Sequence, residues 1–152
     1  MLVDAAGDSD GVRITTEMGN VFKYCPPLTG ERWIEVNLST QSLIAWQGKV
    51  KINSTLISSG KDGFWTPTGT FYINARYRYK DMAGCEGGEC WYVPDVQYAQ
   101  YFTYEGHAIH VATWHNLFGI KRLSHGCINV PLSFAAWLWN WSTYGTRIWI
   151  HY

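Results

Sequence analysis

Apolar and polar residues alternate one by one in several short runs along this chain. Ile34, Val36 and Leu38 are separated by single residues that tolerate water, and the same period of two returns at 50–56 and 146–152. Successive side chains of a β-strand point to opposite faces, so this period predicts half-buried strands. Shorter strands are predicted at 42–46, 71–73, 98–104 and 108–112. The chain is therefore expected to be mainly β.

One helix is expected, over residues 131–143. Four bulky side chains recur there at the spacing i, i+3, i+4, i+7, which places them on one face of a helix: Phe134, Trp137, Leu138 and Trp141. Pro131 suits a first helical turn, and Gly145 suits the stop. The aromatic stripe indicates core packing rather than a cofactor site.

The chain divides into two parts of different character. Residues 1–30 resemble an arm or linker that ends in a short strand, and residues 31–152 carry the regular pattern of one domain. Within the domain, residues 75–97 have no clean period. A long irregular insertion in a compact domain is typical of a functional lid, with an ordinary surface excursion as the alternative.

Composition limits the partners that the chain can have. The 12 basic and 12 acidic side chains give a formal net charge of zero, so nothing favours nucleic acid or an anionic membrane surface. No apolar run approaches the roughly 20 residues that span a bilayer. Residues 1–10 contain no basic residue before an apolar stretch, so no signal peptide is expected there.

The four cysteines fall into different settings. Cys85 and Cys90 bracket a Glu-Gly-Gly-Glu stretch that can close a small loop, which favours a disulfide over two loop thiols. Cys25 precedes two prolines and is expected to be a buried or half-buried thiol. A zinc site formed by His110, His125 and Cys127 is a weak alternative, because the spacing of these residues fits no familiar zinc motif.

Cys127 follows a glycine, which permits a tight backbone beside the thiol. In such a turn the N–H groups of Gly126 and Cys127 can point at a common spot, as an oxyanion hole requires. A free thiol has a pKa near 8.5 and needs a base, because the thiolate is the nucleophile. In an extended strand His107 and His110 would face opposite sides. His125 is too near Cys127 in sequence to suit the role of base.

Several segments together resemble the L,D-transpeptidase catalytic domain of the YkuD type. Ser124-His125-Gly126-Cys127 is similar to the SHGC signature of this family, and His110 stands 17 positions before Cys127, as the family's base does. Residues 66–71 resemble its TPTG segment, residues 38–41 its opening strand-turn, and Gly145-Thr146 its closing strand. The likeness runs from Ile34 to Ile150 and implies a β-sandwich-like fold with a helix after the cysteine.

The resemblance implies a role for each residue of the motif. Cys127 is the expected nucleophile and His110 its base, oriented by the backbone carbonyl of Val111, where the family often has glycine. Ser124 and His125 are expected to support the turn. Asn129 stands where the family often has arginine, so an arginine contact to a substrate carboxylate is not assumed. Cleft walls are expected at Trp65, Tyr101, Trp114, His115 and Asn129.

The resemblance also implies substrate and reaction. The expected donor and acceptor are peptidoglycan stem peptides: the thiolate attacks the L-centre carbonyl of the third stem residue, terminal D-alanine leaves, and an amine takes the acyl group in a 3→3 cross-link. Hydrolysis of the same stems by an L,D-carboxypeptidase is one alternative, and a non-catalytic peptidoglycan-binding module is another. The family uses no metal or cofactor and is acylated by carbapenems. The substrate implies an extracytoplasmic location.

Overall fold

The computed structural model describes residues 28–152 and the backbone of two short strands before them, β1 (Val12–Thr15) and β2 (Phe22–Cys25). These two strands pair antiparallel. The expectation for the Cys25 side chain lies outside the described residues, and the division at residue 30 stays a prediction.

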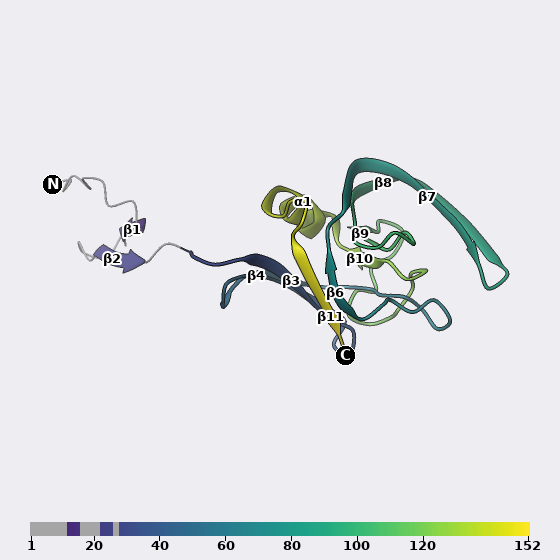
Figure 1. The fold of residues 1–152 in the computed structure, drawn as a ribbon, viewed down its shortest axis with the longest axis horizontal. Coiled ribbons are helices and arrows are strands. Elements are labelled where there is room, and N and C mark those ends of the chain that lie inside the picture. The colour runs from purple at the N-terminus through teal and green to yellow at the C-terminus, as the bar shows by residue number, and fades with distance from the viewer. Residues whose placement is uncertain (1–11, 16–21, 26–27) are drawn as a thin grey trace.

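A five-stranded sheet contains the strands that the alternation predicts. Its order is β5-β4-β3-β11-β6, and its members are β3 (Arg32–Asn37), β4 (Ser42–Gln47), β5 (Val50–Leu56), β6 (Gly69–Tyr72) and β11 (Arg147–His151). The last strand of the chain, β11, inserts between β3 and β6 and runs parallel to β3 (Figure 1). Residues 34, 36, 148 and 150 are buried, so the alternation marks the core face of this sheet correctly.

A four-stranded sheet carries the residues of interest. Its order is β10-β9-β8-β7, and its members are β7 (Ala75–Glu86), β8 (Glu89–Tyr101), β9 (Ala108–Val111) and β10 (Ile128–Val130). Strands β9 and β10 are parallel, and their residues 109, 111, 128 and 130 are buried in the same core cluster as the first sheet. The two sheets therefore enclose one apolar core, as in the expected β-sandwich-like fold.

The prediction of an irregular insertion at 75–97 is wrong about the local structure of this segment. Strands β7 and β8 form a long antiparallel hairpin that arches over β9 and β10 (Figure 1). Most residues of β7 are exposed or half-buried, so neither face of that strand shows an apolar stripe. The location of a lid-like element is as expected, but it is a regular ribbon.

Helix α1 (Leu132–Trp141) covers the core directly after the short strand β10. Phe134, Ala135 and Leu138 are buried, while Trp137 and Trp141 are partly buried against the same cluster. Pro131 is the residue before the helix, rather than within it. Of the described residues, no helix is long and apolar enough to cross a membrane.

Candidate active site

The motif at 124–127 forms a tight turn that leads into β10. The Gly126 N–H donates to Ser124 Oγ at 3.1 Å, and the Ser124 hydroxyl donates to the Cys127 carbonyl oxygen. Ser124 therefore closes the turn on itself. The same bonds occupy the Gly126 N–H, so the expected pair of free donors is wrong for this turn. The Cys127 N–H has no partner among residues 28–152.

Two further residues hold this turn from the outside. Thr66 Oγ1 donates to the Gly126 carbonyl oxygen and accepts from the Gly60 N–H, both at 2.9 Å. A side chain at Gly60 would place its Cβ 1.8 Å from the Phe64 carbonyl oxygen and 3.0 Å from the Gly126 Cα. Only glycine fits there, because backbone approaches from both sides. Sequence reasoning quoted Thr66 as part of a motif but gave it no role, and it missed Gly60.

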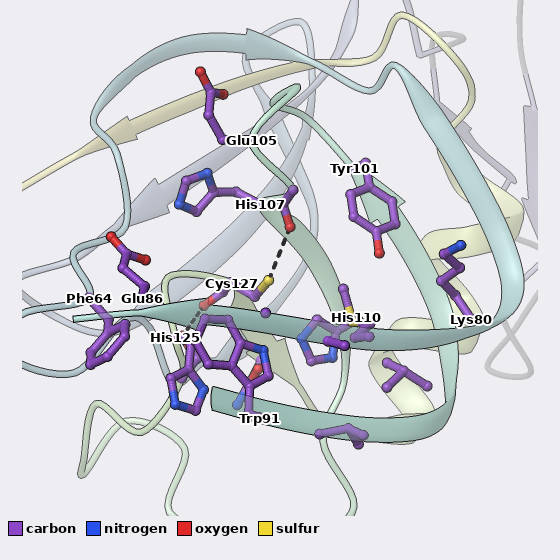
Figure 2. Close-up of a pocket in the computed structure, with 18 of the residues that line it drawn as sticks. Phe64, Lys80, Glu86, Trp91, Tyr101, Glu105, His107, His110, His125 and Cys127 are labelled. Carbon is purple, nitrogen blue, oxygen red and sulfur yellow. Dashed lines mark hydrogen bonds between the residues drawn. The ribbon is translucent and has the colours of Figure 1, made fainter. Parts of the chain in front are cut away.

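Cys127 and His110 are brought to one cavity by the β9–β10 pair. His110 lies on β9, and Cys127 lies in the bend directly before β10, which pairs with β9. Both side chains line the same cavity (Figure 2). The Cys127 Sγ lies 3.7 Å from the Gly106 carbonyl oxygen.

The imidazole of His110 is buried and has one defined orientation. Its Nδ1 lies 2.7 Å from the Val111 carbonyl oxygen. Because a carbonyl oxygen can only accept, Nδ1 carries the hydrogen and Nε2 keeps its lone pair. Burial lowers the pKa of His110 to about 4, against the opposing effect of the Val111 carbonyl. His110 is therefore neutral near pH 7 and has the lone pair that a base needs.

Cys127 is a neutral thiol in the resting site. Burial raises its pKa to about 11, although the backbone N–H of Ala108 favours the thiolate. A thiolate–imidazolium pair would require the reverse order of the two pKa values. A thiol in this state becomes a nucleophile only when its proton is transferred to a base. Tyr101 stays protonated as well: burial, with Cys127 and Tyr77 nearby, raises its pKa to about 12.

The cavity has a volume of about 810 Å³ and lies between the β7–β8 hairpin and the turn of residues 124–127, the candidate catalytic turn. The expected cleft residues Trp65, Tyr101, Trp114 and Asn129 all line it. His115 does not; it lies behind Asn129, with the Asn129 amide 3.3 Å from its Nε2. The hairpin also contributes walls that sequence reasoning missed, among them Asp81, Glu86 and Trp91.

His107 and His125 both have surroundings that the sequence did not predict. His107 lines the cavity together with His110, because it lies in the turn before β9, where strand alternation does not apply. His125 faces the hairpin: its Nε2 lies 2.7 Å from Glu89 Oε1, and its ring stacks on Trp91. Among the described residues, no group of three or more His, Cys, Asp or Glu side chains is arranged to hold a metal ion.

A thiol and a neutral imidazole that share a cavity beside a tight turn define a cysteine-dependent acyl-transfer domain. Comparison with known families agrees with this class. The model of the L,D-transpeptidase catalytic domain, YkuD, matches residues 31–150. This chain belongs to that family.

Individual relatives support the assignment. L,D-transpeptidase 2 of Mycobacterium tuberculosis is 30% identical over 102 residues, which cover 60% of this chain and 25% of the relative. The chain thus matches about a quarter of that protein's length. An L,D-transpeptidase structure from Mycobacterium smegmatis has a TM-score of 0.75 at 22% identity and covers 97% of this chain and 81% of its own, which establishes similarity of fold. The catalytic domain of the E. faecium L,D-transpeptidase has a TM-score of 0.72 at 29% identity, over 81% of this chain and 98% of its own.

Proposed function

We propose that this chain is a peptidoglycan L,D-transpeptidase with Cys127 as nucleophile and His110 as general base. The observation that carries the proposal is the lone pair of His110 Nε2, fixed by the Val111 carbonyl on the cavity face that also presents Cys127. Family membership supplies the substrate class, peptidoglycan stem peptides. An extracytoplasmic location follows from that substrate.

The first half-reaction forms a thioester. His110 Nε2 takes the proton from Cys127 Sγ as the sulfur attacks the L-centre carbonyl of the third stem residue. The bond between this carbonyl carbon and the nitrogen of terminal D-alanine breaks, and His110 returns the proton to that nitrogen. The Cys127 N–H is the proposed donor to the oxyanion, since the Gly126 N–H is engaged by Ser124.

The second half-reaction frees the thiol again. An amine of a second stem attacks the thioester carbonyl, the C–S bond breaks, and a 3→3 cross-link forms. The neutral imidazole accepts the amine proton and delivers a proton to the departing sulfur. Attack by water instead gives the carboxypeptidase product, a shortened stem.

Acylation by a β-lactam tests the nucleophile. We expect one covalent mass shift when this chain meets a carbapenem, and none for Cys127→Ala. Labelling of Cys127→Ala at another cysteine would overturn the assignment.

Product analysis tests the reaction itself. Purified disaccharide tetrapeptides are incubated with the protein, and the products are identified by mass spectrometry. Cross-linked dimers with release of D-alanine support transfer, and tripeptides alone support hydrolysis. Sacculus binding without any product, equal for the parent protein and Cys127→Ala, would indicate a binding module instead.

A further inference from the structure

A tight two-glycine turn and a disulfide both close the tip of the β7–β8 hairpin. Gly87 and Gly88 both have positive φ, 58° and 81°, as a two-residue turn between twisted strands requires. One pair further from the turn, Cys85 and Cys90 are opposite each other in the ladder and joined by a disulfide. The disulfide favoured by the sequence is thus present, and it restrains the tip.

The residues on either side of Cys90 face the catalytic turn. Glu89 and Trp91 are two apart on β8, so they share a face, and the disulfide lies on the opposite one. Glu89 Oε1 lies 2.7 Å from His125 Nε2. The Trp91 ring stacks on the same imidazole with centroids 4.0 Å apart and planes 8° apart. His125, two residues from Cys127, is therefore held by Glu89 at the edge of its ring and by Trp91 on the face of its ring.

Lys61 binds the same carboxylate as His125. Lys61 Nζ lies 2.8 and 3.0 Å from the two oxygens of Glu89. The backbone N–H of Lys61 donates to the Ser124 carbonyl oxygen at 2.9 Å. Both partners of Glu89 are thus attached to the catalytic turn. The Lys61 bond, followed by the His125 bond, lowers the pKa of Glu89 below its usual range, so this carboxylate stays charged.

The hairpin is shaped for this contact. A Cβ at Gly84, which is opposite Trp91 in the ladder, would lie 2.3 Å from the Trp91 ring. The absence of a side chain lets the indole lie flat across the neighbouring strand. Phe64 adds an edge-on contact to both Trp91 and His125, at 6.0 and 4.9 Å between centroids. These three rings form one wall of the cavity beside Cys127 (Figure 2).

From this arrangement we infer that Glu89 is a positioning residue that latches the hairpin tip onto the catalytic turn and sets the fate of the thioester. The inference rests on the proposed function. With the tip docked, the wall of the cavity beside Cys127 is in place and restricts water, so an amine bound in the cavity meets the thioester carbonyl. With the tip released, water reaches the same carbonyl, and the product is a free carboxylate. Glu89 thereby determines the ratio of transfer to hydrolysis.

Glu89→Ala tests the latch against a matched control. Glu31→Ala also removes an exposed carboxylate that pairs with a cation, but its partner is Arg147, 2.7 Å away on β11 of the five-stranded sheet. In Glu89→Ala we expect the transfer-to-hydrolysis ratio to fall about threefold to tenfold, the loss of one or two charge-assisted hydrogen bonds. Glu89→Gln keeps an accepting oxygen and should recover part of the ratio, while Glu31→Ala should match the parent.

Hydrogen exchange provides a reading that does not depend on turnover. Amides of residues 82–93 should exchange faster in Glu89→Ala than in the parent or in Glu31→Ala. A double variant, Cys85→Ser with Cys90→Ser, should move both readings in the same direction, because the tip loses its cross-link while Cys127 is intact.

The outcomes separate the two proposals. Unchanged exchange in Glu89→Ala, or an unchanged product ratio in an active enzyme, overturns the latch. Absence of acylation in the parent protein overturns the proposed function, and the exchange comparison then still decides whether Glu89 holds the hairpin.

Discussion

His110 Nδ1 is bonded to the carbonyl oxygen of the very next residue, Val111, at 2.7 Å. Many catalytic imidazoles are oriented by a carboxylate side chain, which also stabilises the charged ring. A neutral carbonyl orients the ring with much less bias toward the imidazolium. Together with burial, this explains a resting site in which both the imidazole and the thiol are uncharged.

Acylation should be nearly independent of pH from about 6 to 9. His110, with a pKa of about 4, stays neutral over this range, and Cys127, with a pKa of about 11, stays protonated. The competent pair therefore dominates throughout. The check is the rate of carbapenem acylation, followed by loss of β-lactam absorbance. A tenfold rise per pH unit would mean that free thiolate attacks without help from the base.

His110→Gln provides the comparison for that profile. The variant has no base, so its acylation should be slower by about 10²- to 10⁴-fold near neutral pH. Its rate should then rise with pH, because only thiolate formed by solvent base can attack. A flat profile in both proteins would contradict the role of His110.

Buried neutral His110 should also make the fold sensitive to acid. Its folded pKa of about 4 is below the ordinary 6.5, so the unfolded chain binds the proton more readily. This contribution to stability is complete above pH 6.5 and is lost as pH falls toward 4, by about 3 kcal/mol. Between pH 6.5 and pH 4, the free energy of unfolding in urea should therefore fall by about 3 kcal/mol more for the parent than for His110→Gln. An equal fall in the two proteins would show that His110 takes up its proton in the folded state as readily as in the unfolded chain.

The sequence predicted the fold where one face of a strand is buried and the other is not. Ile34 and Ile148 belong to alternating runs that predicted their strands, and both are in the core. Strand β7 gives no such signal, because most of its residues face solvent, and its regularity comes from pairing with β8. Hydrogen bonds to the partner strand impose no apolar period on the side chains.

The same reasoning separates what was found in the site from what was missed. A motif and its spacing predicted Cys127 and His110 as the reacting pair, and both line one cavity. The contact between Glu89 and His125 joins residues 36 positions apart and depends on the docking of the hairpin, for which no local pattern exists. His107 was assigned to a strand that begins one residue later. Gly60 shows its constraint only when the backbones of Phe64 and Gly126 are in place.

Gly126→Ala should impair acylation more than its backbone strain alone explains. Gly126 has a φ of 107°, and an added Cβ would lie 2.9 Å from the His107 ring. That ring cannot swing away freely, because its Nδ1 is bonded to Thr103 Oγ1 at 2.8 Å. We expect a loss of about 1 to 3 kcal/mol in stability and, because the turn at Cys127 shifts, at least about a tenfold loss in acylation rate.

Gly63→Ala separates strain from collision. Gly63 also has a positive φ, 85°, but an added Cβ would meet nothing within 4 Å. It should lose about 1 kcal/mol in thermal unfolding, with acylation close to that of the parent. If both variants behave alike, the contact with His107 has no role in shaping the turn.

Thr66→Val should weaken the site from outside the cavity wall. The substitution keeps the shape of the side chain but removes the hydroxyl that joins the Gly60 N–H to the Gly126 carbonyl. Both backbone groups would remain buried without a partner, which costs about 2 to 4 kcal/mol. Thr66→Ser keeps the hydroxyl and is the matched control, so it should lose much less. Because Gly126 immediately precedes Cys127, we also expect slower acylation of the folded Thr66→Val protein, measured by mass spectrometry below its unfolding transition. Parent-like acylation with a lowered melting temperature would restrict Thr66 to a stabilising role.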